Sequence, residues 1–246
     1  MSDEIGTMMQ PPVAAHRFVK LHPDVPRPNF LWYIHLPLNL WKFIDIHPER
    51  WQAQNARLVE DFIPGVRLRA AEKRGLRNQL EKIVFDAQEA GVLMTLVLPG
   101  ILESGIPFAA SLRVRWYNMS PARASIEPLK SEFRRDDVDT YLSDDNVEYL
   151  LVKAESTVGP LTKQQTAYHV EAYLPIIGTS WLLIISSTVP TKDMVNDMCN
   201  LVTRVVNSVQ TYPSEVNLPV TQLCDSFHVG DTYFTYDSGN FTDSSD

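Results

Sequence analysis

Three side chains that could take part in proton transfer alternate along one predicted strand. His169, Glu171 and Tyr173 are spaced two residues apart within 166–174, and alternate residues of a strand project from the same face of a sheet. An imidazole beside a carboxylate is an arrangement that general acid–base catalysis uses. The same spacing also fits the solvent side of an antiparallel strand, whose other face would carry Tyr168, Val170, Ala172 and Leu174.

Other sequence patterns for chemistry do not occur in the chain. The glycine-rich patterns that let a backbone approach phosphate are missing, and Glu103-Ser104-Gly105 lacks the first glycine of a nucleophile elbow. The six histidines are scattered, so none forms the close ligand pair that a zinc site needs. We therefore expect no enzymatic activity, no cofactor and no metal. The alternative is an enzyme whose site is assembled only in the fold, from the pool His169, Glu171, His35, Asp45 and Cys199.

Two clusters could bind a partner instead. Aromatic residues stand among acidic and polar ones near the C-terminus and could anchor an interface: Tyr233, Phe234, Tyr236 and Phe241. Basic residues gather where a helix is predicted to begin: Arg67, Arg69, Lys73, Arg74 and Arg77. A net charge of −8 does not suit nucleic-acid binding. We expect the partner to be another protein or a second copy of this chain; a solvated helix face and a solvated tail are the alternatives.

The elements that must position these residues predict one α+β domain over residues 30–210. Segments rich in aromatic and β-branched residues predict strands at 30–36, 40–46, 92–98, 108–116, 147–155, 166–174 and 181–188. The first two segments could instead form one bent strand. A short amphipathic helix is expected between Pro48 and Pro64, and a second over 68–90. A long amphipathic helix is expected from Thr191, which could cap it, to Val209. Because the late strands are joined by short turns, we expect an antiparallel sheet flanked by helices.

Both ends of the chain differ in composition from this domain. Residues 1–29 contain five prolines and no strand or helix periodicity, which predicts an extended N-terminal arm. Residues 211–246 contain six acidic residues and no Lys or Arg, which predicts an acidic C-terminal tail. Within the domain, the polar segment 118–146 is expected to be a connection or a short helix.

The sequence favours a cytoplasmic protein. Its start is acidic, unlike a signal peptide, and its most apolar run, 181–185, is far shorter than the roughly 20 residues of a membrane-spanning helix. Cys199 and Cys224 do not form the pattern of a disulfide scaffold. We therefore expect a reducing compartment and no contact with a membrane.

Four segments resemble those of a group of uncharacterised actinobacterial proteins, some of which accompany type VII secretion components. They are Trp41-Lys-Phe-Ile-Asp-Ile, Ala110-Ser-Leu-Arg-Val, Glu148-Tyr-Leu-Leu-Val and Tyr173-Leu-Pro-Ile-Ile-Gly-Thr-Ser-Trp-Leu-Leu. The order of elements also resembles the PsbP-like and Mog-like layout of a sheet covered by helices. The likeness spans about residues 30–210 and carries no active-site residues over. It implies an accessory or adaptor role.

The function that these observations favour is a non-enzymatic cytoplasmic protein-interaction or adaptor module. The arm and the acidic tail are poor core material and would be available to dock onto a partner. A structural subunit of a larger complex, in which both ends become ordered against neighbours, is a further alternative. The sequence leaves the partner, any ligand and the oligomeric state open.

Overall fold

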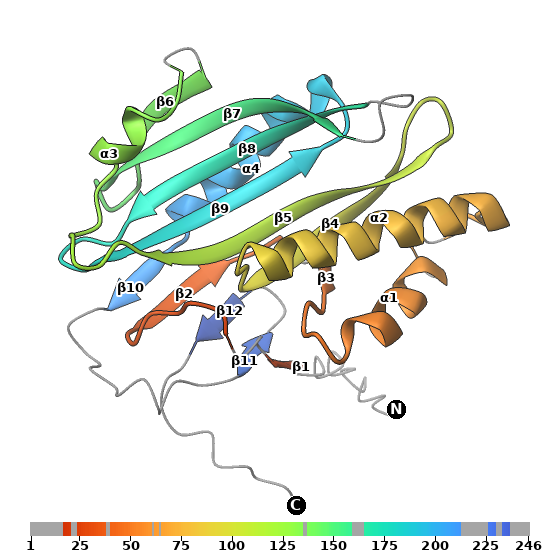
Figure 1. Ribbon diagram of the computed structural model, residues 1–246, viewed down its shortest axis with the longest axis horizontal. Coiled ribbons are helices and arrows are strands. Elements are labelled where there is room, and N and C mark those ends of the chain that lie inside the picture. The colour runs from red at the N-terminus through yellow and green to blue at the C-terminus, as the bar shows by residue number, and fades with distance from the viewer. Residues whose placement is uncertain are drawn as a thin grey trace, which may run out of the picture.

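The protein is described by a computed structural model. It describes residues 17–20, 24–37, 40–60, 62–63, 65–134, 137–158, 165–212, 226–229 and 233–236. These residues form an α+β structure of two antiparallel sheets with helices on both sides of the larger one (Figure 1). The predicted fold class, an antiparallel sheet flanked by helices with a long C-terminal amphipathic helix, is confirmed.

The larger sheet has seven strands in the order β3-β4-β5-β9-β8-β7-β6, and every neighbouring pair is antiparallel. The strand bounds in this order are Lys42–Ile44, Met94–Ile101, Pro107–Asn118, Trp181–Val189, Gln165–Pro175, Glu148–Val158 and Val138–Leu142. Gly178, with φ +79°, supplies the left-handed residue of the short turn between β8 and β9. Strand β6 lies within the polar segment for which only a connection or short helix was predicted.

The smaller sheet joins segments from both ends of the chain. Its five strands have the order β1-β11-β12-β2-β10 and the bounds Arg17–Lys20, Ser226–Val229, Tyr233–Tyr236, Leu31–His35 and Gln210–Tyr212. The predicted arm contributes β1, and the predicted tail contributes β11, β12 and two of the three residues of β10. Strands β1, β11 and β12 lie wholly in these segments. These three strands were not predicted, because each is four residues long and therefore too short to show a period of two.

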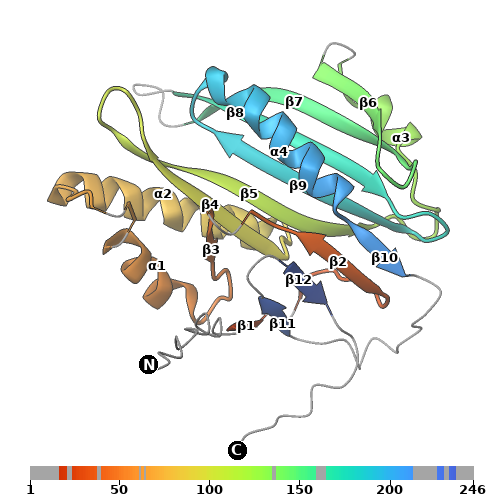
Figure 2. The ribbon, with the colours of Figure 1, turned by 180° about the vertical axis from the view of Figure 1, so that it is seen from behind.

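Helices cover the seven-stranded sheet on opposite faces. Helices α1 (Trp51–Glu60), α2 (Ala70–Glu89) and α3 (Glu127–Lys130) lie on one side, and α4 (Val195–Asn207) lies on the other, as Figure 1 and Figure 2 show from front and back. A 3-10 turn, η2 (Lys192–Met194), precedes α4. Thr191 precedes that turn and its side chain makes no capping hydrogen bond, so its predicted capping role is corrected.

The main core lies between the seven-stranded sheet, α4 and β2. It contains the inward residues of α4, such as Val202 and Val205, together with Trp32 of β2 and Ile185 of β9. A second cluster packs α1 and α2 against the β3–β4–β5 end of the opposite face, and a third packs the α3 region against β7, β8 and β9. The predicted strands at 30–36 and 40–46 belong to different sheets, as β2 and β3, and do not form one bent strand.

Candidate functional site

Polar side chains of four neighbouring strands project from the face of the seven-stranded sheet that also carries α2 and α3. Residues directly opposite one another in an antiparallel ladder share a face. One row across the sheet consists of Glu171, Ser186, Arg113 and Thr95. The next row consists of His169, Thr188 and Ser111. We call the part of this face that carries Arg113, Arg115, Tyr117, Ser156, His169, Glu171, Tyr173, Ser186 and Thr188 the polar face.

Hydroxyl groups on both sides hold the His169 ring in place. Ser156 Oγ of β7 lies 2.5 Å from His169 Nε2, and Thr188 Oγ1 of β9 lies 3.0 Å from Nδ1. Burial lowers the pKa of His169 below its ordinary value of 6.5, with Glu171 acting in the opposite direction and Arg113 in the same direction as burial. A neutral ring donates through one nitrogen and accepts through the other. The two hydroxyls, each able to donate or accept, can therefore satisfy both ring nitrogens of His169.

Glu171 and Tyr173 interact directly. The Tyr173 hydroxyl donates to Glu171 Oε2 at 2.5 Å, across the two-residue spacing expected for one face of a strand. Burial raises the pKa of Tyr173, and the nearby Glu171 carboxylate raises it further. Tyr173 therefore stays protonated and fixes the position of the carboxylate.

Arg113 brings a positive charge to the same row. Its side chain is 18% exposed, and its Nη2 atom lies 3.9 Å from Asp86 Oδ2 of α2. Burial lowers the pKa of Arg113, while Asp86 and Glu171 raise it. Its Nε–H is buried and has no acceptor among the residues that the structure describes. The charge is thus held between two carboxylates with part of its hydrogen-bonding capacity unused.

The polar face lies between two helical covers, and Tyr173 at its edge is buried in the cluster beneath the α3 region. Helix α2 packs over β4 and the start of β5, where Gln79 exchanges hydrogen bonds with the backbone of Ala109 (3.3 Å each). The α3 region packs over β7 and β8 at the other side, through Ile126. No helix of the described chain covers the strands between them (Figure 1). Tyr117, which is 52% exposed, belongs to this open part.

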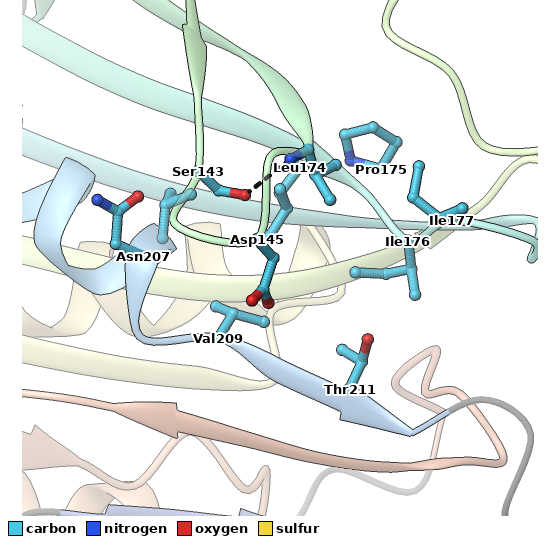
Figure 3. A pocket seen from close by; sticks show the side chains of 11 residues that line it. Ser143, Asp145, Leu174, Pro175, Ile176, Ile177, Asn207, Val209 and Thr211 are labelled. Carbon is cyan, nitrogen blue, oxygen red and sulfur yellow. Dashed lines mark hydrogen bonds between the residues drawn. The ribbon is translucent and has the colours of Figure 1, made fainter.

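A cavity of about 240 Å³ lies elsewhere, where the β6–β7 turn, the end of β8, the end of α4 and β10 meet (Figure 3). Its walls are mostly apolar, with four polar side chains among them. The lining residues are Ser143, Asp145, Val147, Leu174, Pro175, Ile176, Ile177, Val206, Asn207, Val209 and Thr211. Because Leu174 and Val206 also belong to the main core, the cavity is on the α4 side of the sheet.

The structure describes the backbone of three of the four aromatic residues that were predicted to bind a partner. The backbone of Tyr233, Phe234 and Tyr236 forms β12, which pairs with β2 on one side and with β11 on the other. Phe241 lies outside the described residues. This part of the tail is a strand inside a sheet, and its role in partner binding stays a prediction.

The predicted basic cluster gathers around the start of α2. Arg67, Arg69, Arg74 and Arg77 are exposed, and Lys73 forms an ion pair with Glu60 of α1. The Arg69 N–H donates to the Glu72 carboxylate at 2.6 Å, which closes the first turn of the helix. A partner role for this cluster also stays a prediction.

The candidate pool for an enzyme does not meet in one place. His169 and Glu171 share the polar face, whereas Cys199 packs with α4 against the opposite face. His35 belongs to β2 of the smaller sheet, and Asp45 forms an ion pair with Arg50 (2.8 Å) just before α1. Only the His169–Glu171 pair of that pool remains a candidate site. Burial also raises the pKa of the Cys199 thiol, which disfavours the nucleophilic thiolate.

Among the described residues, no group of three or more His, Cys, Asp or Glu side chains is arranged to hold a metal ion. None of the described helices combines the length and the hydropathy needed to span a bilayer. Cys224 lies outside the described part of the chain.

Sequence reasoning missed six of the nine residues of the polar face: Arg113, Arg115, Tyr117, Ser156, Ser186 and Thr188. Alternation within a strand shows which residues share a face but does not show which strand lies beside it. The one indication in the sequence is the alternation of Arg113, Arg115 and Tyr117 at the end of the predicted strand 108–116, which puts them on one face. Comparison of the sequence with protein-family models gives no match, and comparison with curated proteins finds none that is similar.

Proposed function

We propose that the protein is a non-enzymatic interaction module, an adaptor or accessory component, that binds another protein through the polar face. The observation that carries this proposal is the pair of charges Arg113 and Glu171. Both are only partly exposed and are held by neighbours, on a part of the sheet that no described helix covers. Side chains that are already positioned lose less conformational entropy on binding than freely moving ones.

The chemistry of the polar face suits a protein partner better than a polyanion. Arginine and tyrosine are enriched in protein interfaces, and Arg115 and Tyr117 stand at the accessible side of this face. A nucleic-acid phosphate backbone would meet the Glu171 carboxylate beside the arginines, which opposes binding. A protein surface can instead present charges of both signs in a matching arrangement.

Photo-crosslinking tests where the partner binds. The photoreactive residue p-benzoylphenylalanine replaces Tyr117 on the polar face, and in a matched control it replaces Tyr141, a 41% exposed tyrosine on the α4 side of β6. We expect one partner to be captured from Tyr117 in cells, identified by mass spectrometry, and not from Tyr141. Capture from neither position, or equally from both, would contradict the proposal.

Charge reversal then tests the same contact with the purified partner. We expect Arg115→Glu to weaken binding at least about tenfold, because it reverses a charge at the interface. The control is Arg74→Glu in the predicted basic cluster, which we expect to leave affinity unchanged. If Arg74→Glu abolishes binding and Arg115→Glu does not, the basic cluster is the contact and the polar face is not.

Point variants are preferable to deletion of the tail. A chain ending at Gln210 would lose β11 and β12, and with them the strands that pair with β1 and β2. Loss of binding in such a chain would report a damaged sheet as readily as a missing contact. The tail aromatics are better tested by Tyr233→Ala and Tyr236→Ala in the full chain.

A second candidate function is favoured by one specific contact. Ser156 Oγ lies within hydrogen-bonding distance of His169 Nε2, and Thr188 orients the other ring nitrogen. A hydroxyl beside a neutral imidazole whose far nitrogen is held by a third group is the arrangement of an activated nucleophile. This would make the protein a hydrolase acting through Ser156, with His169 as the base.

A fluorophosphonate probe separates the two candidates. A hydrolase would be labelled at Ser156, and the labelling would disappear in Ser156→Ala and fall strongly in His169→Gln. The proposed binding module would show no labelling above that of Ser156→Ala, while still crosslinking through position 117.

A further inference from the structure

The walls of the 240 Å³ cavity favour an alkyl group. Seven of its eleven lining residues are apolar: Val147, Leu174, Pro175, Ile176, Ile177, Val206 and Val209. Five of these are drawn with labels in Figure 3, on the β8 end, the following turn and the segment after α4. Displacing water from such walls is favourable by about 25 cal/mol for each Å² of apolar surface removed from water. The volume suits a short aliphatic chain better than a ring system of drug size.

The polar groups of the cavity favour a positive charge at one end of that chain. Figure 3 shows the Asp145 carboxylate directed between the β6–β7 turn and Val209. Asn207 Oδ1 is buried and accepts no hydrogen bond from any described residue. The cavity also adjoins the C-terminal end of α4, where the helix dipole is negative. All three features attract a cation.

None of the lining side chains carries a positive charge that could take the place of a bound cation. Ser143 Oγ already accepts the N–H of Val147 at 3.1 Å, which holds the turn in shape. Thr211 is neutral, and none of the eleven lining residues, all within the described chain, is Lys or Arg. The exposed Asp145 carboxylate therefore has no cation among the lining residues, and the buried Asn207 amide oxygen has no donor among the described residues.

We propose that this cavity binds a primary alkylammonium group. Its alkyl stem would lie against Leu174, Ile177 and Val209, and its ammonium would face Asp145 and Asn207. The same chemistry is offered by a free alkylamine and by the lysine side chain of a bound protein segment. This inference goes beyond the proposed function, because the cavity opens on the α4 side of the sheet and shares no residue with the polar face.

Nuclear magnetic resonance titration of the full ¹⁵N-labelled chain tests the proposal with n-butylammonium as the probe and 1-butanol as its uncharged counterpart. We expect saturable amide shifts confined to the cavity, at Asp145, Ile177 and Asn207, with butylammonium. We expect 1-butanol to bind at least about tenfold more weakly, since it lacks the charge. Equal binding of both probes, or no saturable shift at these amides, would overturn the proposal.

Two neighbouring aspartates supply a matched pair of variants. Both are exposed in the β6–β7 turn, but only Asp145 lines the cavity. Asp145→Asn should weaken butylammonium binding about twofold to fivefold, the range for an exposed ion pair. Asp144→Asn should leave it unchanged. Equal losses would show only a general attraction to an acidic turn and would refute a built site.

The source of the ammonium is resolved by a second probe, lysine blocked at both its α-amino and α-carboxyl groups. Binding of blocked lysine at least as tight as that of butylammonium indicates the side chain of a partner segment. Binding of butylammonium with exclusion of blocked lysine indicates a free amine. Both results keep the alkylammonium assignment and decide between its two sources.

Discussion

The two faces of strands β8 and β9 differ in what covers them. On the α4 side, Val170 and Ile185 are fully buried under α4 and its neighbours. On the other side, His169, Glu171 and Ser186 are half-buried; His169 is hydrogen-bonded to Ser156 and Thr188, and Glu171 accepts from Tyr173. The first face holds the fold together through apolar burial, and the second keeps charges in position at a smaller gain in stability. The residues that stabilise the fold therefore lie on one face, and the residues that we propose for partner binding lie on the other.

The largest effect should follow from truncating the apolar face. Ile185→Ala should lower the free energy of unfolding by about 2–5 kcal/mol, because it leaves a cavity in the main core. Its neighbour Ser186, which projects from the polar face, provides the control: Ser186→Ala should change stability by less than about 0.5 kcal/mol. Urea unfolding of both variants measures the difference. Similar losses would mean that the polar face is as structural as the core.

Alternation and turn chemistry predicted most of the seven-stranded sheet. The apolar residues of 166–174 and 181–188 mark the face that packs on α4, and the repeat after Thr191 marks the helix that covers it. The Tyr173–Glu171 contact also follows from a two-residue spacing within one strand. The contacts of His169 do not, because Ser156 and Thr188 come from neighbouring strands whose register depends on the whole sheet.

The smaller sheet could not be predicted for a related reason. Strand β1 pairs with β11, more than two hundred residues away, and each strand alone has too few residues to show a pattern. Pairing between strands so far apart in the sequence depends on tertiary contacts, which no local pattern shows. Similarly, the cavity is made by three separate stretches of the chain, 143–147, 174–177 and 206–211, and nothing in any one of them indicates it.

A smaller loss of stability is expected when the hydroxyl of Tyr173 is removed, and an even smaller one for Tyr149 on the opposite face. The Tyr173 hydroxyl donates to the Glu171 carboxylate, whereas the buried Tyr149 hydroxyl reaches Thr203 Oγ1 only at 3.5 Å, on the α4 side. Tyr173→Phe should lower stability by about 1–2 kcal/mol, since it removes a hydrogen bond to a charged acceptor. Tyr149→Phe should cost less than about 0.5 kcal/mol, because its bond is at the limit of length. Equal losses, measured by urea unfolding, would remove this distinction between the faces.

The His169 ring makes the polar face sensitive to pH. Because burial lowers its pKa in the folded state, the unfolded chain binds a proton more readily below pH 6.5. The stability that depends on the neutral ring is therefore complete above pH 6.5 and is lost as the pH falls through the folded-state pKa. His169→Gln should show a shallower loss of stability than the natural protein between pH 7.5 and 5.5, as measured by urea midpoints. Parallel pH profiles would contradict a buried neutral His169.

The smallest change of stability is expected for a substitution at Thr95, in the part of this face that α2 covers. Thr95 is fully buried opposite Arg113, and its hydroxyl has no partner among the described residues. Thr95→Val removes an unsatisfied polar group with little change of shape, so it should raise stability by up to about 1 kcal/mol. Thr188→Val, which removes a hydroxyl bonded to His169, should instead lower it by about the same amount. Opposite signs in thermal unfolding would show that the open part of the face, and not the part under α2, depends on its polar network. A loss in both variants would mean that the Thr95 hydroxyl has a partner, such as a buried water shared with Arg113 Nε, and that the polar network continues beneath the helix.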